Sequence, residues 1–204
     1  TGEEIIEKPG ATHYASTIEM AKLHEKFDSC VIDEIQMIAD PQRGWAWTRA
    51  LVNIVSPEVH LCGDGSALNL IKDILALTGD ELEIKNYERM TELLVEDKAL
   101  SLRELKKGDA VIVFSRRNAL KHKAELEKMN FKVSVIYGML SPEVRREQAR
   151  KFDEEETDII VSTDAIAMGM NLPVRRIVFT SFSKFIDGKE HPLSMSEIKQ
   201  ISGR

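Results

Sequence analysis

Residues 110–115 read AVIVFS, an uninterrupted apolar run that ends in a hydroxyl side chain. A run this short and this rich in β-branched residues predicts a buried strand. It is followed, at residues 118–129, by a stretch with helical spacing. A strand that leads directly into a helix is the unit from which parallel α/β sheets are built.

The same pattern recurs on both sides of this stretch. Further strands are predicted at residues 30–34, 59–64, 133–138, 158–164 and 176–181, and further helices at residues 45–55, 67–78 and 142–152. Ser141 followed by Pro142 is a typical helix start. Because the strands are continuously apolar rather than alternating, we expect sheets covered on both faces. The fold class predicted is therefore α/β with parallel sheets.

Polar side chains collect where these strands end. In parallel sheets, ligands bind at the carboxyl ends of the strands. We therefore expect one functional edge that includes the following residues: Asp33, Glu34, Asp64, Ser115, Gly138, Thr163 and Asp164.

Charge is divided unevenly along the chain. The net charge is −6, with 43% hydrophobic and 30% charged residues. Residues 1–90 carry 8 basic and 16 acidic side chains, whereas residues 91–204 carry 20 basic and 18 acidic ones. This change predicts a domain boundary between residues 88 and 100. Basic pairs in the second half, at 116–117, 145–146 and 175–176, either face phosphates or are solvated helix faces and loop ends.

Several function classes are excluded. No apolar run approaches the roughly 20 residues that span a bilayer, and no signal peptide is visible at the start. Cys30 and Cys62 lie in apolar runs and are expected to be buried free thiols. No histidine or cysteine spacing suits zinc. Because the chain does not begin with methionine, we expect it to start inside a longer protein.

The paired carboxylates Asp33 and Glu34 follow a strand directly. One such carboxylate can hold Mg²⁺ through water, while its neighbour positions or deprotonates an attacking water. Helix capping or a solvated turn is the alternative. A Thr163 hydroxyl and nearby backbone N–H groups can bind a backbone phosphate. Gln200 and Arg204, four residues apart, would share a helix face, from which an arginine can reach a phosphate.

The order of these features resembles superfamily 2 helicases over nearly the whole chain. Residues 33–36 (DEIQ) look like motif II, residues 63–66 occupy the place of motif III, and residues 114–115 look like motif IV. Residues 162–171 look like motif V and residues 200–204 like the start of motif VI.

Longer strings narrow the resemblance to the mitochondrial degradosome RNA helicase family and its bacterial relatives. They are VIDEIQMI at 31–38, RGWAWTRA at 43–50 and TDAIAMGMNL at 163–172. The resemblance implies tandem RecA-like lobes with parallel sheets and ATP between them. Residues 1–90 would form the C-terminal part of the first lobe, which is incomplete, and residues 91–204 the second lobe, truncated at its end. No G-x-x-x-x-G-K-[ST] loop (Walker A) occurs, so this chain alone is expected to hydrolyse little or no ATP.

The resemblance also implies roles for single residues. Asp33 would hold Mg²⁺ through water, Glu34 would act as catalytic base, and Gln36 would link the nucleotide to the second lobe. Gln200 and Arg204 would complete the catalytic set, and Gly169 and Asn171 would approach the nucleotide or its ribose. The expected RNA contacts, several of which could instead be strand or helix caps, are Thr1, Gly2, Thr17, Ser115, Gly138, Thr163 and Asp164. Trp45 and Trp47 are expected to be helix-packing residues, and a turn role is the alternative for Asp64.

The implied function is an ATP- and Mg²⁺-dependent RNA helicase that moves 3′ to 5′ during RNA degradation, with an exoribonuclease as partner. A DNA-directed translocase and a non-catalytic RNA-binding scaffold are the alternatives. The bacterial cytoplasm is the preferred location and the mitochondrial matrix the alternative, with no membrane association.

Overall fold

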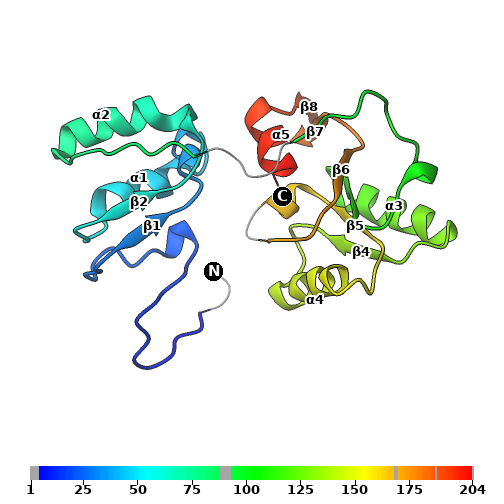
Figure 1. The fold of residues 1–204 in the computed structure, drawn as a ribbon, viewed down its shortest axis with the longest axis horizontal. Coiled ribbons are helices and arrows are strands. Elements are labelled where there is room, and N and C mark those ends of the chain that lie inside the picture. The colour runs from blue at the N-terminus through cyan, green and yellow to red at the C-terminus, as the bar shows by residue number, and fades with distance from the viewer. Residues whose placement is uncertain (1–4, 88–92, 168–169, 187, 204) are drawn as a thin grey trace. The chain divides into compact units, whose positions relative to one another are not determined.

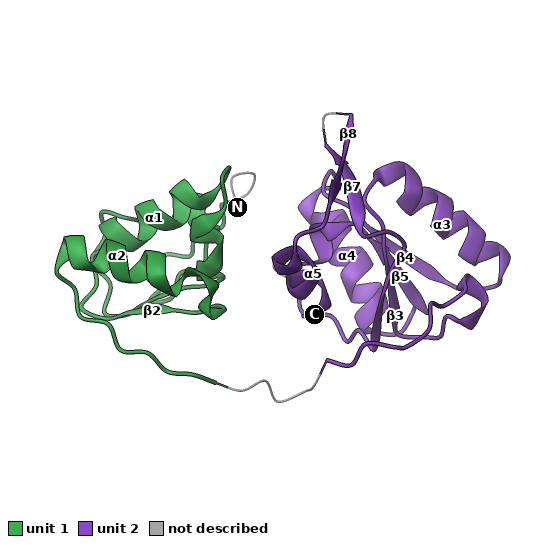
Figure 2. Cartoon of the chain, turned by 90° about the horizontal axis from the view of Figure 1, so that it is seen from above, with its two compact units in different colours: residues 1–88 green, residues 89–204 purple. Residues whose placement is uncertain are grey.

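The computed structural model describes residues 5–87, 93–167, 170–186 and 188–203. The chain divides into two units, residues 1–88 and 89–204 (Figures 1 and 2). Within the described residues, no helix is both long enough and apolar enough to cross a membrane.

The first unit is a small parallel α/β layer. Its strands β1 (Cys30–Ile32) and β2 (Val59–Leu61) pair in parallel, and α1 (Gly44–Asn53) connects them. α2 (Leu68–Thr78) follows β2 and ends at Gly79, which takes the left-handed conformation (φ 79°) that glycine adopts without strain. Three short 3-10 helices complete the unit: η1 (Ile18–Met20), η2 (Ile35–Ala39) and η3 (Gly65–Ala67).

Helices α1 and α2 cover one face of this two-stranded sheet (Figure 2). Ile32 is 1% exposed and packs in the core with Trp47 and Ile71, whereas its neighbour Val31 is 66% exposed. Successive side chains of a strand point to opposite faces. Among the described residues of this unit, helices cover one face of the sheet, which differs from the predicted cover on both faces.

The prediction of buried free thiols is correct about the free thiols but wrong about their burial. Both thiols are free, but Cys30 is half-buried and Cys62 is exposed. Cys62 lies just beyond the end of β2, where the chain has left the core.

The second unit contains the parallel sheet predicted from the sequence. Its strands run in the order β4-β5-β3-β6, and every neighbouring pair is parallel. The strands are β3 (Asp109–Ile112), β4 (Val133–Ile136), β5 (Ile159–Ser162) and β6 (Arg176–Phe179). All residues of β3, β4 and β5 are buried.

Helices cover both faces of this second sheet, as the continuous apolar strands predicted. Side chains of α3 (Arg116–Lys128) pack on one face with Val111 and Val161. α4 (Pro142–Asp153) and α5 (Met195–Ser202) pack on the other face (Figure 1). The 3-10 helices of this unit are η4 (Leu102–Glu104) and η5 (Asp164–Ala167).

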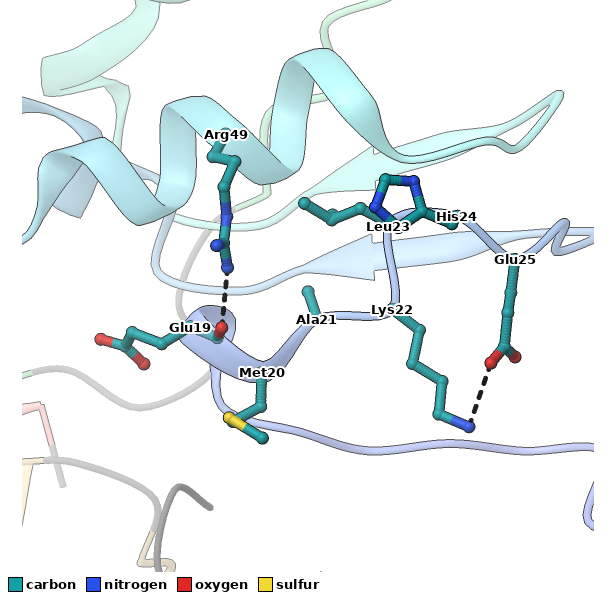
Figure 3. Close-up of a pocket in the computed structure, with 8 residues that line it drawn as sticks. All are labelled: Glu19, Met20, Ala21, Lys22, Leu23, His24, Glu25 and Arg49. Atoms are coloured by element: carbon teal, nitrogen blue, oxygen red, sulfur yellow. Dashed lines mark hydrogen bonds and ion pairs between the residues drawn. The ribbon is translucent and has the colours of Figure 1, made fainter.

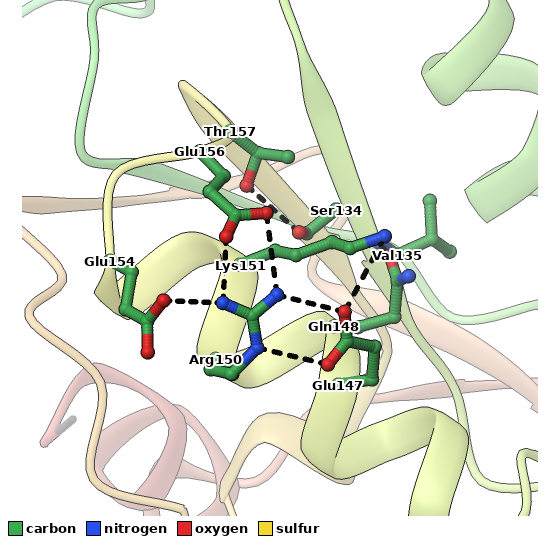
Figure 4. Close-up of polar contacts among 9 residues, drawn as sticks. All are labelled: Ser134, Val135, Glu147, Gln148, Arg150, Lys151, Glu154, Glu156 and Thr157. Atoms are coloured by element: carbon green, nitrogen blue, oxygen red, sulfur yellow. Dashed lines mark hydrogen bonds and ion pairs between the residues drawn. The ribbon is translucent and has the colours of Figure 1, made fainter.

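α4 also protects the edge of the sheet. β4 is an edge strand, and the side-chain oxygen of Gln148 accepts the backbone N–H of Val135 at 2.9 Å (Figure 4). Covering an edge N–H in this way opposes pairing with another chain. At the end of α4, Arg150 pairs with Glu147, Glu154 and Glu156, but these side chains are too exposed to add much stability.

An antiparallel hairpin, β7 (Ser183–Ile186) and β8 (Lys189–Pro192), was not predicted. The Asp-Gly dipeptide at residues 187–188 is the hairpin signal that could have revealed it.

Candidate active site

Asp33 and Glu34 lie in the turn that follows β1. Glu34 takes a left-handed backbone conformation (φ 52°, ψ 44°), which is uncommon for a residue with a side chain. Such a conformation costs about 1–3 kcal/mol and is enriched at functional sites, although Asn130 and Glu155 also adopt it in turns after α3 and α4. Oδ1 of Asp33 accepts the backbone N–H of Glu34 at 2.9 Å, which fixes the Asp33 carboxylate against this turn.

Gln36 connects this turn to the residues that follow β2. Its Nε2 donates to Oε2 of Glu34 at 2.5 Å, and its Oε1 accepts the backbone N–H of Asp64 at 3.3 Å. The Asp64 side chain accepts the Ser66 N–H, so Asp64 also has the turn role weighed as the alternative. The structure thus brings together residues from the two segments that resemble motifs II and III.

Backbone contacts bind the two segments tightly. The Ile35 N–H donates to the Cys62 carbonyl and the Cys62 N–H to the Ile32 carbonyl, each at 2.9 Å. At Gly63, an added Cβ would lie 2.2 Å from Oε1 of Gln36. Only glycine therefore fits at this position without displacing Gln36.

Trp47 is a further residue of this site that the sequence did not single out as functional. It is 6% exposed, and its Nε1–H donates to the Asp33 carbonyl at 2.9 Å. Its predicted packing role is correct. Trp45, by contrast, is 56% exposed, because two positions along a helix it faces away from the core.

The donor set at this turn suits Mg²⁺. Magnesium is held through one or two carboxylates, with waters and phosphates as its other ligands. Asp33 is exposed, and within the described part of the chain its Oδ2 receives no hydrogen bond. No group of three or more metal-ligating side chains occurs among the described residues. The residues therefore fit a magnesium ion that is shared with a phosphate ligand, and not a closed protein cage.

Thr17 precedes η1, next to the helix that carries Trp47. Arg43 donates from Nε and Nη2 to Oε1 of Glu19 at 3.1 and 2.6 Å, and Nη2 of Arg49 donates to the Glu19 carbonyl at 2.7 Å. Burial alone would raise the pKa of Glu19, but the hydrogen bond and charge of Arg43 hold that pKa below its usual range. A pocket of about 370 Å³, lined by residues 19–25 and Arg49, lies beside this segment (Figure 3).

In the second unit, three of the expected RNA-contacting residues follow neighbouring strands at one edge. The register sets the last residues of β3, β4 and β5 side by side, so Ser115, Gly138 and Thr163 lie at the same edge of the sheet. The Ser115 hydroxyl accepts the Asn118 N–H and the Thr163 hydroxyl accepts the Ala165 N–H, so both act as caps. Gly138 is exposed, and its carbonyl accepts a hydrogen bond from Arg145.

The remaining predicted residues are distributed as follows. Asp164 is exposed at the start of η5, Asn171 is exposed, and Gln200 is half-buried on α5. Four lie outside the described residues: Thr1, Gly2, Gly169 and Arg204.

The basic pair at 175–176 does not face the functional edge. Both arginines lie at the start of β6 and pair with the fully buried Asp109, at 2.9 Å for Arg175 and 2.7 Å for Arg176. These residues are at the amino end of the strands, so the phosphate-binding interpretation of this pair is wrong.

Sequence comparison covers both units. Residues 1–87 match the DEXQ-box helicase domain of Suv3, and residues 86–204 match the helicase conserved C-terminal domain. The whole chain is 48% identical to the mitochondrial ATP-dependent RNA helicase SUV3 of Candida albicans and 44% identical to the mitochondrial ATP-dependent RNA helicase SUPV3L1 of Mus musculus. It spans 29% and 28% of the length of these two proteins. Both names include the mitochondrion, which agrees with the predicted alternative location and gives no support to the bacterial cytoplasm.

A solved structure shares the fold. The structure of Saccharomyces cerevisiae Dbp5 bound to RNA and ADP BeF3 is similar over 87% of this chain and 50% of that chain, with a TM-score of 0.61. At 14% sequence identity, this similarity concerns the fold alone.

Proposed function

Because the chain belongs to the superfamily 2 helicases, with a Suv3-type DEXQ-box domain followed by a helicase conserved C-terminal domain, we propose that the protein is an ATP-dependent RNA helicase. Its fold is the α/β fold of RecA-like helicases, with parallel sheets, as the sequence predicted. We assign residues 1–88 to the C-terminal part of the first RecA-like lobe and residues 89–204 to the second. The proposal rests above all on the turn after β1, where Gln36 donates to Glu34 and accepts the backbone N–H of Asp64.

The carboxylates of this turn have separate tasks in the proposal. Asp33 would hold Mg²⁺, through water. The ion would neutralise charge that develops on the phosphates of ATP as the terminal phosphoryl group is transferred to water. Glu34 orients the attacking water and accepts its proton, and Gln36 fixes the Glu34 carboxylate by the hydrogen bond between them.

Residues of the second unit complete the proposed machinery. Gln200 and Arg204 contact the phosphate of bound ATP, and Gly169 and Asn171 lie close to the nucleotide or its ribose. Thr1, Gly2 and Thr17 in the first unit, together with Ser115, Gly138, Thr163 and Asp164 in the second, contact the RNA backbone. Ser115 and Thr163 can do so although their oxygens accept cap hydrogen bonds, because a hydroxyl that accepts one bond still donates its own proton.

Further features are carried over from the family resemblance. They are 3′-to-5′ movement, a role in RNA degradation with an exoribonuclease partner, and a mitochondrial location, which the names of the relatives favour. Import of the tagged full-length protein into isolated mitochondria tests the location.

Glu34→Gln in the full-length protein tests the proposed function. We expect RNA-stimulated ATP hydrolysis to fall by about 10²- to 10⁴-fold, the usual contribution of a general base, while RNA binding persists. Glu58→Gln is the matched control, because Glu58 is an exposed carboxylate just before β2, at the amino end of that strand.

The alternatives predict other results. A DNA-directed translocase is stimulated more by single-stranded DNA than by RNA of the same sequence. A non-catalytic scaffold binds RNA equally well with and without ATP, and Glu34→Gln changes nothing. Either result contradicts the proposal.

A further inference from the structure

Helix α1 contacts both the ATP-site turn and residues 17–20, here called the 17–20 segment. This segment contains η1 and begins at Thr17, a proposed RNA contact. On the first side, the indole N–H of Trp47 donates to the carbonyl of Asp33 at 2.9 Å. Trp47 is almost fully buried, and a buried indole N–H needs such an acceptor. A phenylalanine at this position could not hold this carbonyl, since its ring has no donor.

On the second side, two arginines of the α1 region hold Glu19. Arg43, which precedes α1, binds the Glu19 carboxylate with two donors. Arg49, six residues further on, binds the Glu19 backbone carbonyl (Figure 3). Glu19 is therefore held both by its side chain and by its backbone, which fixes it against the α1 region more firmly than either contact alone.

Arg43 also connects the two sides. Its guanidinium lies 5.4 Å from the centre of the Trp47 ring, within the range of a cation–π contact. The contacts therefore run without a gap from Glu19 through Arg43 and Trp47 to the backbone of Asp33. All of them lie inside the first unit and do not depend on the position of the second.

These contacts are poorly explained by stability alone. The Arg43 and Glu19 side chains are 40% and 32% exposed, and ion pairs with such exposure stabilise a fold only weakly. The Nε of Arg49 is buried and has no hydrogen-bond partner among the described residues. Burial of this donor lowers the free energy of unfolding. The arrangement is better suited to holding one segment in register with another.

We propose that Arg43, Arg49 and Trp47 form a positioning relay that transmits RNA occupancy of the 17–20 segment to Asp33, and so couples RNA binding to ATP hydrolysis. The relay rests on the proposed helicase function. RNA that contacts this segment changes the position of Glu19. Arg43 and Arg49 transmit this displacement to α1. Trp47 then shifts the carbonyl of Asp33, the residue that would hold magnesium. Its members are positioning residues, which act on the reaction through Asp33.

Trp47→Phe in the full-length protein is the direct test, because it keeps an aromatic ring and removes only the N–H donor. ATP hydrolysis is measured without RNA and at saturating single-stranded RNA, together with the RNA concentration that gives half of the stimulation. We expect the RNA-stimulated rate to fall about 10-fold, within the range of pairwise couplings between contacting residues. The rate without RNA should fall less than the RNA-stimulated rate, since the variant alters no group that contacts the phosphate. Trp45→Phe is the matched control: Trp45 lies on the same helix but is exposed, and phenylalanine keeps a ring for its contact with Arg49 at 5.2 Å.

A double-mutant cycle at Arg43 and Glu19 tests the second link. Arg43→Gln and Glu19→Gln should each reduce the stimulation. The double variant should be no worse than Arg43→Gln, because both substitutions break the Arg43–Glu19 contact and only Arg43→Gln also removes the contact with Trp47. Arg43→Lys, which keeps the charge but not the planar pair of donors, should retain part of the stimulation. Thermal unfolding of each variant identifies any that does not fold, and Arg43→Lys then replaces Arg43→Gln in the cycle.

Three results overturn the relay. They are unchanged stimulation in Trp47→Phe, an equal fall in the rates with and without RNA, and fully additive effects of Arg43→Gln and Glu19→Gln. If the unmodified protein shows no RNA-stimulated hydrolysis at all, the proposed function itself fails. That result is distinct from the other three, which leave the helicase proposal intact.

Discussion

At Gly63 the backbone passes so close to Gln36 that a methyl group does not fit. An added Cβ would lie 2.2 Å from Oε1 of Gln36 and 3.0 Å from a methyl carbon of Ile35. Two residues later, at Gly65, an added Cβ meets nothing within 4 Å. The two glycines, two residues apart, thus differ: a side chain has no free space at Gly63 and free space at Gly65.

Gly63→Ala should displace Gln36 and weaken its hydrogen bond to Glu34. Overpacking of this kind costs about 1–3 kcal/mol, so we expect a lower unfolding temperature together with slower RNA-stimulated ATP hydrolysis. Gly65→Ala is the control and should change neither. The close approach would be irrelevant to the site if both variants hydrolysed ATP at the same rate as the unmodified protein.

At the scale of the elements, Glu197 both caps the start of α5 and connects this helix to β7. Glu197 accepts the Ser194 N–H at 2.8 Å in a capping box, and it also pairs with Lys184 of β7. Burial alone would raise the pKa of Glu197, but the bonds from Lys184 and Ser194 hold that pKa below its usual range. Through these contacts the glutamate fixes both the start of α5, which carries Gln200, and the position of the hairpin beside it.

The contribution of Glu197 should depend on pH. Because its pKa is lower in the folded state than in the unfolded state, the stabilisation is complete above the ordinary carboxyl pKa of about 4.3 and is lost as the pH falls through the folded value. We expect Glu197→Gln to reduce the hydrogen-exchange protection of α5 at pH 7, and this difference to shrink towards pH 3. Glu143→Gln, at an exposed first-turn glutamate of α4, is the control. A difference that stayed constant from pH 7 to pH 3 would contradict the ionic explanation.

At the scale of the whole molecule, Asp109 connects the segment before β3 to the sheet of the second unit. This fully buried carboxylate opens the central strand β3 and binds Arg175, Arg176 and the backbone N–H of Lys106. Arg176 in turn binds Glu96, which lies in the segment that leads from the first unit to η4. The carboxylates around Arg176 raise its pKa, so the guanidinium stays charged.

Asp109→Ala should destabilise the second unit strongly, because it leaves two arginines without their buried partner. Breaking a buried ion pair costs 3–5 kcal/mol, and we expect about 3 kcal/mol here since the Arg175 side chain is half-exposed. The more exposed Glu96 provides the control, and Glu96→Gln should cost less than about 1 kcal/mol. Urea unfolding of the full-length protein, followed by hydrogen exchange in β3 and β6, measures both. Equal effects of the two variants would show that burial of Asp109 is not what matters.

The sequence alone determined the parallel α/β fold and most of its elements. Apolar runs gave every strand of the two parallel sheets, and helical spacing placed α1 to α4 within two residues of their ends. Apolar runs and helical spacing are both local signals, because the side-chain period of a strand or helix can be recognised from consecutive residues. The order of polar strand ends also indicated the helicase superfamily, to which the chain belongs.

The tertiary structure decided what depends on residues far apart in the chain. It turned the arginines at 175–176 towards Asp109, 66 and 67 residues away. It also set Trp47 against Asp33 and Arg43 against Glu19, across 14 and 24 residues. No local pattern marks these pairs, since each is fixed by the packing of one element on another.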